Sequence, residues 1–248
     1  MKGVTPMTEI EIRSLTKQYK DVTAVDGLSL TVERGELFGL LGVNGAGKTT
    51  TIKMLSTLTP PTSGDALISG RSILTEKQAI RRIIAISPQE TAVAENLTVR
   101  DNLRMMAGIY SMDKSAAERK IAELCEALSL RGVMDKRAKK LSGGYKRRLS
   151  IAMALINSPE VLFLDEPTLG LDVIARAELW DTIKAIKGSL TIILTTHYLE
   201  EAEEMCDRLA VMKSGRLITV GTSDEIMHTA GEDTLEKAFV KLVKEVRA

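Results

Sequence analysis

A glycine-rich turn between an apolar run and a helical pattern constrains this chain more than any other feature. Residues 42–49 read Gly-Val-Asn-Gly-Ala-Gly-Lys-Thr and fit the pattern GxxxxGK[ST] at every fixed position. The glycines let the backbone curl so that successive N–H groups point at phosphate oxygens. The helix that follows directs its positive end to the same place. The turn therefore predicts a phosphate site that binds ATP or GTP.

The side chains of this turn suggest how a nucleotide would be held. Lys48 is expected to bridge the terminal phosphates, and the Thr49 hydroxyl is expected to hold Mg²⁺. A plain glycine-rich connection between a strand and a helix is the alternative, and a full match in the right place argues against it. The remaining residues expected to bind the nucleotide are Gly42, Asn44, Gly45, Ala46, Gly47 and Thr50.

Two adjacent carboxylates follow an apolar run in the second half of the chain. Residues 161–164, Val-Leu-Phe-Leu, lead directly into Asp165 and Glu166. The carboxyl end of such a strand meets the ligand edge of an open α/β sheet. Asp165 is expected to bind Mg²⁺, and Glu166 is expected to act as general base on an attacking water. Without the glycine turn, a strand that runs into a solvated turn would be the simpler interpretation.

Short apolar runs alternate with helical patterns along the chain, which is typical of a mixed α/β fold. We expect a P-loop NTPase core with a mixed sheet, an N-terminal antiparallel β subdomain and an inserted α-helical subdomain, all within one domain. The core and β subdomain should take about residues 1–94 and 157–220, the helical subdomain about 95–156, and a short helical tail about 221–248. Strands are expected over 10–15, 28–32, 36–41, 66–69, 83–86, 161–164, 190–194 and 209–212, and helices over 48–58, 98–130, 145–156, 175–186 and 198–205.

The composition restricts the class of protein. The 34 Lys and Arg residues balance 33 Asp and Glu, so no overall charge draws the chain to nucleic acid or to anionic lipid. The longest apolar run, Ile151 to Ile156, is far shorter than the ~18 residues that a membrane span needs. Residues 1–10 show no secretory signal, and two cysteines without a CxxC pattern fit a reducing cytoplasm.

A second glycine-lined helix start follows at Leu141-Ser142-Gly143-Gly144. The simple interpretation is an ordinary N-cap serine followed by glycines. These four residues also resemble the LSGGQ signature of the ABC transporter nucleotide-binding domain, with Tyr145 in place of the glutamine. The resemblance extends from Ile10 to about Val220, and it is specific because several independent motifs occur in family order.

The resemblance assigns further residues. Tyr19 resembles the aromatic that stacks on adenine, although a strand aromatic packed at a turn is the alternative. Gln89 resembles the glutamine that contacts Mg²⁺ and senses the membrane partner. Asp172, at the end of Leu169-Gly170-Leu171-Asp172, resembles the residue that meets the partner subunit. His197 resembles the histidine that contacts the γ-phosphate, whereas His228 has no such support and is expected at the surface.

The family's head-to-tail arrangement implies that one subunit's signature completes the other's ATP site. Leu141, Ser142, Gly143, Gly144 and Asp172 would then act in trans. The resemblance implies ATP and Mg²⁺ as cofactors, a second ATPase subunit that makes a homodimer, and a separate transmembrane permease. It places the chain in the cytoplasm, on the inner face of the cell membrane. The sequence of residues 234–242 resembles the C-terminal tail of ABC-2-type exporter ATPases, a branch that handles drugs, polysaccharides and lipids.

Other functions leave sequence features unexplained. A soluble ABC ATPase on the ribosome or DNA would resemble a tandem pair or carry a long coiled-coil insertion, and neither is present. A P-loop GTPase or small-molecule kinase would leave the second glycine turn unexplained, and no NKxD guanine motif occurs. Residues 136–148 carry seven cations, which favour a solvated face over a nucleic-acid site, so no nucleic acid is expected.

Overall fold

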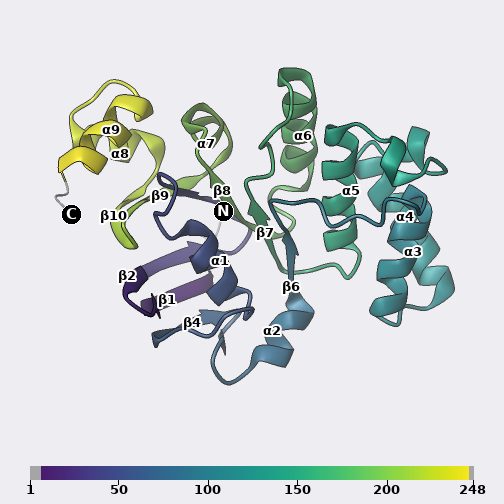
Figure 1. Cartoon of the computed structure of the whole chain (residues 1–248), viewed down its shortest axis with the longest axis horizontal. Coiled ribbons are helices and arrows are strands. Elements are labelled where there is room, and N and C mark those ends of the chain that lie inside the picture. The colour runs from purple at the N-terminus through teal and green to yellow at the C-terminus, as the bar shows by residue number, and fades with distance from the viewer. Residues whose placement is uncertain (1–6, 246–248) are drawn as a thin grey trace, which may run out of the picture.

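The computed structural model describes residues 7–245, and its centre is a six-stranded sheet in the order β10-β9-β3-β8-β7-β6 (Figure 1). Five strands are parallel to their neighbours, and β10 is antiparallel to β9 at one edge. The strands are β3 (Leu37–Leu41), β6 (Ile84–Ser87), β7 (Val161–Asp165), β8 (Thr191–Thr196), β9 (Arg208–Lys213) and β10 (Arg216–Gly221). Ser214 and Gly215 form the turn between β9 and β10, both with positive φ.

A second, antiparallel sheet comes from the N-terminal part of the chain, in the order β2-β1-β4-β5. Its strands are β1 (Thr8–Tyr19), β2 (Val22–Glu33), β4 (Ser63–Ile68) and β5 (Arg71–Ser72). β1 and β2 form a long hairpin, and buried and exposed residues alternate along β2 from Leu28 to Glu33, as a sheet with one buried face requires. The expected antiparallel N-terminal sheet beside a mixed sheet is thus confirmed.

Helices surround the two sheets, and three of them gather at one end of the molecule (Figure 1). These three are α3 (Val99–Ile109), α4 (Lys114–Ala127) and α5 (Gly143–Leu155), and short 3₁₀ turns Arg131–Val133 and Ala138–Lys140 connect α4 to α5. At the opposite end, α8 (Ser223–Ala230) and α9 (Leu235–Glu245) pack beside β9 and β10. The others are α1 (Lys48–Leu55), α2 (Lys77–Ile83), α6 (Val173–Ile186) and α7 (Leu199–Met205).

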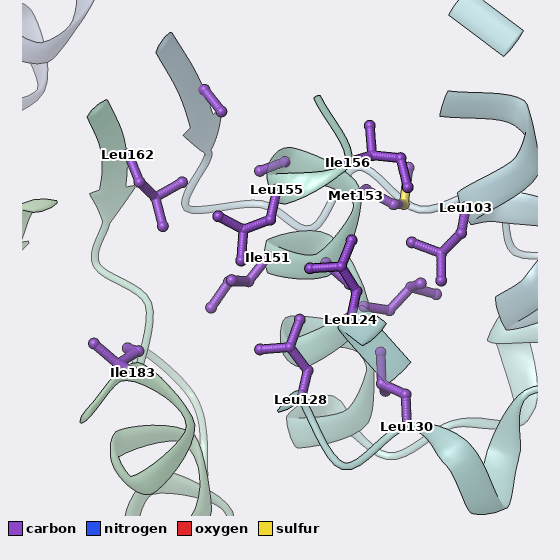
Figure 2. Close-up of a cluster of buried hydrophobic side chains, with 14 of the residues drawn as sticks. Leu103, Leu124, Leu128, Leu130, Ile151, Met153, Leu155, Ile156, Leu162 and Ile183 are labelled. Atoms are coloured by element: carbon purple, nitrogen blue, oxygen red, sulfur yellow. The ribbon is translucent and has the colours of Figure 1, made fainter. Parts of the chain in front are cut away.

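The alternation of side chains on the central strands divides the core. On β7, Val161 and Phe163 face the N-terminal sheet, whereas Leu162 and Leu164 face the helices. Figure 2 shows the helical side, where Leu162 and the α6 residue Ile183 lie across from the apolar side chains of α5. Burying each such side chain stabilises the fold by about 1.5–3 kcal/mol. The helical end therefore shares one continuous core with the sheet that carries the carboxylates.

Several element boundaries differ from the sequence prediction. The helix expected over 48–58 ends at Leu55, because Thr57 has φ of 60° and the N–H of Leu58 turns back to the Lys53 carbonyl. The helical stretch 98–130 is two helices, and Asp113 caps the second of them. Helix α2 was not predicted. Residues 1–6 and 246–248, which belong to the first and last expected ranges, lie outside the described residues.

Candidate functional site

The glycine turn leaves β3 and enters α1, as its position in the sequence predicts. Two of its glycines are required by close packing. A Cβ on Gly47, where φ is 101°, would lie 2.5 Å from the carbonyl oxygen of Ala24, and one on Gly42 would lie 2.6 Å from that of Met212. Strands β2 and β9 therefore approach the turn so closely that no side chain fits. Within the described chain, no side chain caps α1, so its first N–H groups remain available to an anion.

Lys48 lies in the first turn of α1 and is buried beneath the loop. Its Nζ donates a hydrogen bond of 2.6 Å to the carbonyl oxygen of Gly42. Burial lowers the pKa of Lys48, and the nearby carboxylates of Glu166 and Asp165 act against this shift by favouring the charged form. The turn thus holds a cation beside backbone N–H donors, which is the combination that binds phosphate.

Asp165 ends β7 and is held by two threonine hydroxyls. Thr195, on the neighbouring strand β8, donates a hydrogen bond of 2.6 Å to Asp165 Oδ1, and Thr49 donates to the same oxygen at 3.3 Å. The Asp165 side chain is buried, so these bonds fix its orientation. The Thr49 hydroxyl and the Asp165 carboxylate together supply oxygen ligands of the kind that Mg²⁺ prefers.

Glu166 follows Asp165 with the left-handed φ of 46°. Its N–H donates to the Thr195 hydroxyl at 3.0 Å, which ties the turn to β8. A carboxylate oxygen of Glu166 lies 3.4 Å from Nδ1 of His197, the residue that follows β8. Because Asp165 still belongs to the strand and Glu166 turns away from it, the two carboxylates occupy different positions and can perform different tasks.

Most of the glycine turn, together with Glu166 and His197, lines one cavity of about 1060 Å³. Among the residues assigned from the sequence, ten line it, and they come from α1, the glycine turn, the segment after β6, and the ends of β7 and β8: Asn44, Gly45, Ala46, Gly47, Lys48, Thr49, Thr50, Gln89, Glu166 and His197. Gly45 is open at its Cβ position, with no atom within 4 Å, so a ligand can approach its backbone.

Other predicted residues lie outside this cavity. The Gly42 carbonyl oxygen accepts a hydrogen bond from Lys48, and the Asp165 carboxylate accepts one from Thr49, so both residues contact the lining of the cavity. Tyr19 does not line the cavity; it is half exposed at the end of β1, and the Lys17 ammonium lies 5.0 Å from its ring. It pairs across the hairpin with Val22, which does line the cavity. The structure thus places Tyr19 near the edge of the site and not within it.

The signature turn is separate from that cavity, since no residue of 141–144 lines it. The Ser142 hydroxyl accepts a bond of 3.5 Å from the N–H of Tyr145 and caps α5. Ser142 and Gly143 are exposed, whereas Gly144 packs so tightly that its Cβ would lie 2.9 Å from that of Ala175. Asp172 is also outside the cavity, where its carboxylate caps α6 by accepting from the Ala175 N–H at 2.9 Å.

The basic segment 136–148 is not uniformly solvated, which corrects the sequence prediction. Its first four cations are exposed, but Arg147 and Arg148 on α5 are buried. Arg148 pairs with Glu178 at 2.9 Å and stacks on the ring of Tyr145. Helical geometry explains the error: counting charges along the sequence ignores which side of α5 faces the core. His228 is exposed, as expected.

Sequence reasoning missed several residues that support the site. Thr195 bonds Asp165 and Glu166, but a lone threonine in a strand has no distinguishing pattern. On α7, the buried Glu201 accepts a bond of 2.8 Å from Thr168 and lies 3.2 Å from Arg176. Burial raises the pKa of Glu201, while Thr168 and Arg176 favour its charged form. This network joins the turn after Glu166 to the helix after His197.

The residues Val22, Thr23 and Ala24 also line the cavity and were not predicted. They belong to the start of β2, which the sequence prediction began only at residue 28. The β-branched residues Val22 and Thr23 were the sequence signal that could have predicted the earlier start of this strand. Strand β2 therefore forms one wall of the site.

A glycine turn that lines a cavity with a buried lysine, a glutamate and a histidine, placed at the carboxyl ends of parallel strands, defines a P-loop nucleotide-binding protein. Residues 25–169 match the ABC transporter family. The chain belongs to the ABC transporter family and has the fold of its ATP-binding subunits. The family and fold class predicted from the signature are confirmed.

Individual relatives agree with this assignment. The probable multidrug ABC transporter ATP-binding protein YbhF of Escherichia coli (strain K12) is 39% identical over 98% of this chain, which spans 43% of YbhF. The daunorubicin resistance ATP-binding protein DrrA3 of Streptomyces coeruleorubidus is 42% identical over 92% of the chain and 73% of its own length. A solved ATP-binding subunit of an ABC transporter superposes with a TM-score of 0.84 at 31% identity, covering 95% of this chain and 99% of that one.

No helix within residues 7–245 has the length and apolar character that a bilayer span requires.

Proposed function

We propose that this chain hydrolyses ATP with Mg²⁺ in a head-to-tail homodimer and so drives a separate transmembrane permease. The observation that carries the proposal is the convergence of Lys48, Gln89, Glu166 and His197, from four separate parts of the fold, on the cavity of the glycine turn. A purely structural turn would not need charged and polar side chains from four separate parts of the chain around one open glycine. Hydrolysis of a phosphoanhydride needs such groups to bind charge and to activate water.

Each residue has a task in this proposal. Lys48 and the N–H groups of the turn bind the phosphates. The Glu166 carboxylate accepts a proton from the attacking water, whose oxygen bonds to the γ-phosphorus as the bond to the ADP oxygen breaks. His197 contacts the γ-phosphate, and its contact with Glu166 orients both side chains.

The metal requirement follows from the ligands present. Thr49 and Asp165 would hold Mg²⁺, with Gln89 nearby, and the ion would neutralise charge on the β- and γ-phosphates. The hydrogen bond from Thr195 keeps the Asp165 carboxylate aimed at Thr49. Both protein ligands are thus oriented from within the chain.

The exposed signature turn supports the dimer. Ser142 and Gly143 are accessible, lie outside the chain's own nucleotide cavity, and begin a helix whose N-terminus attracts anions. In a head-to-tail dimer, they and Gly144 would cap the γ-phosphate bound by the other subunit's glycine turn, with Leu141 and Asp172 at the same interface. ATP then joins two chains that each supply half of a site.

The names of the relatives support a proposal about the cargo. YbhF is named as a probable multidrug protein and DrrA3 as a daunorubicin resistance protein. Together with the tail that resembles ABC-2-type exporters, these names favour an exporter of the drug, lipid or polysaccharide class. The chain would then lie in the cytoplasm on the inner face of the cell membrane, bound there through the permease.

Sedimentation of the Glu166→Gln variant tests this proposal. With ATP and Mg²⁺, this variant should bind nucleotide without cleaving it and sediment as a dimer, because the bridging γ-phosphate persists. With ADP it should sediment as a monomer. Adding Gly143→Asp is the matched control: the new carboxylate would repel the phosphate across the interface and abolish the dimer. Monomers only at saturating ATP would contradict the head-to-tail site.

A further inference from the structure

The segment that carries Gln89 is fastened to the signature helix by two side chains of α5. Arg147 Nη1 donates to the carbonyl oxygen of Pro88 at 2.6 Å, and its Nη2 donates to that of Gln89 at 2.6 Å. One turn further along α5, the Ser150 and Ser87 hydroxyls are 3.1 Å apart. Because residues three apart lie on the same face of a helix, one side of α5 contacts the whole of residues 87–89.

The charge state of Arg147 makes this contact unusual. The residue is only 4% exposed, and no described carboxylate forms an ion pair with its guanidinium; Asp165 favours the charge only at longer range. Its Nε, among the described atoms, has no hydrogen-bond partner. A buried cation that uses its planar fork on two backbone carbonyls fixes the positions of both peptide groups. Burial lowers the pKa of Arg147, and the more distant Asp165 carboxylate acts against this shift.

The fastened segment joins two cavities. Gln89 lines the nucleotide cavity with Lys48 and Glu166. It also lines a second, smaller cavity together with Arg147 and with Gly143 of the signature turn. Arg147 therefore lies where the surroundings of the γ-phosphate meet the start of the signature helix, and a shift of α5 would move the backbone of Gln89.

We propose that Arg147 is a positioning residue that fixes Gln89 in the nucleotide cavity and links it mechanically to the signature turn. The proposal rests on the function proposed above for what Gln89 does to nucleotide and metal. The contact itself, however, is a property of the chain without nucleotide. Its two consequences can therefore be measured separately.

A core residue that merely stabilises α5 is the competing explanation, and Arg148 provides the matched control. Arg148 is also buried and adjacent in sequence, and its ion pair is directed to Glu178 on α6. None of its described hydrogen bonds reaches residues 87–89. A loss of buried charge on α5 should affect both positions alike, whereas a loss of the fastening should follow Arg147 alone.

The first measurement is hydrogen–deuterium exchange of the peptide that covers residues 84–92 in the chain without nucleotide. Arg147→Met, which keeps an unbranched side chain but is shorter and removes every side-chain donor, should raise exchange in this peptide. Arg148→Met should raise exchange in α5 and α6 and leave this peptide unchanged. Unchanged exchange in Arg147→Met, or an equal rise in both variants, would overturn the proposal whether or not the chain hydrolyses ATP.

The second measurement is a double-mutant cycle on ATP hydrolysis with MgCl₂. Arg147→Met should lower kcat by about 10- to 100-fold, as loss of a supporting partner of a metal-site group does, with little change in KM for ATP. Arg147→Lys, which keeps the charge but reaches one carbonyl, should be intermediate. In a Gln89→Ala background, Arg147→Met should have almost no additional effect, whereas Arg148→Met should keep its own effect. Additive effects of Gln89→Ala and Arg147→Met would refute the link, and an inactive wild type would instead refute the proposed function.

Discussion

Two glycine-lined helix starts in this chain differ in what surrounds them. The turn before α1 has positive φ at Gly45 and Gly47, lacks a capping side chain within the described structure, and opens on a cavity lined by Lys48, Glu166 and His197. The turn before α5 has no positive φ, is capped by Ser142, and lies outside that cavity. The first is a binding site assembled within one chain. The second has the donors for an anion without the groups that act on it, so it fits half of a site.

The largest effect should come from the carboxylate that belongs to the first turn's cavity. Glu166→Gln keeps the shape of the side chain but cannot accept a proton, so turnover should fall by about 10²–10⁴-fold while ATP affinity stays the same. Phosphate release and equilibrium binding of a fluorescent ATP analogue measure the two quantities. Normal turnover would remove Glu166 from its proposed task.

Mixing two inactive variants tests whether the two turns belong to different halves of a shared site. Lys48→Ala should weaken ATP binding by roughly 10- to 100-fold, since a charged hydrogen bond contributes about 1.5–3 kcal/mol. Gly143→Asp should leave binding to the single chain unchanged. Each variant alone should be inactive, but a mixture contains dimers in which one site is intact, so hydrolysis should return.

The control for this experiment is a chain that carries both changes. In a dimer of the double variant with wild type, each of the two sites contains one altered turn. Mixed with either single variant, the double variant should restore no ATP hydrolysis. If a mixture of the single variants stayed inactive although both fold, the two turns would not be complementary halves of one shared site.

Thr195→Val should affect both stability and activity, and its effect on activity should be smaller than that of the preceding variants. The hydroxyl bonds the Asp165 carboxylate and the Glu166 N–H in a buried place, so its loss should lower the free energy of unfolding by about 1–3 kcal/mol. It should also raise the MgCl₂ concentration needed for half-maximal hydrolysis. Urea unfolding and a magnesium titration measure these effects.

Thr191→Val is the matched control, because Thr191 is equally buried on β8 and accepts a bond of 2.9 Å from the Gly35 N–H at the far end of the strand. It should lower stability to a similar extent and leave the magnesium requirement unchanged. Equal shifts in both variants would show that Thr195 supports only the strand.

The smallest effect is expected at the edge of the first turn's cavity. Tyr19→Ala should weaken ATP binding by at most about tenfold, because an aromatic contact contributes about 0.5–1.5 kcal/mol and this ring is half exposed. Tyr19→Phe keeps the ring and should bind ATP as the wild type does. Displacement of a bound fluorescent analogue by ATP or by GTP measures the affinity for each nucleotide. Unchanged ATP affinity in Tyr19→Ala would remove the stacking role.

The sequence was informative where chemistry depends on local spacing. The glycine turn, the two carboxylates at the end of β7 and the Ser142 cap each depend on a few neighbouring residues, and each forms where the sequence predicts it. Long-range partners were less accessible. Thr195, Arg147 and Glu201 matter through contacts with residues 29 or more positions away, apart from Glu201 with Arg176. No periodicity in one sequence reports which strand or helix will lie beside another.

The backbone of Glu166 has a consequence for how this protein can change. Its left-handed φ of 46° is a conformation that a side chain disfavours by roughly 1–3 kcal/mol and that glycine adopts freely. A glycine would relax the chain at this point and remove the carboxylate in the same step. With Glu166 as the proposed base, thermal stability and turnover therefore favour opposite residues at position 166, and a variant selected only for heat resistance would tend to lose the carboxylate.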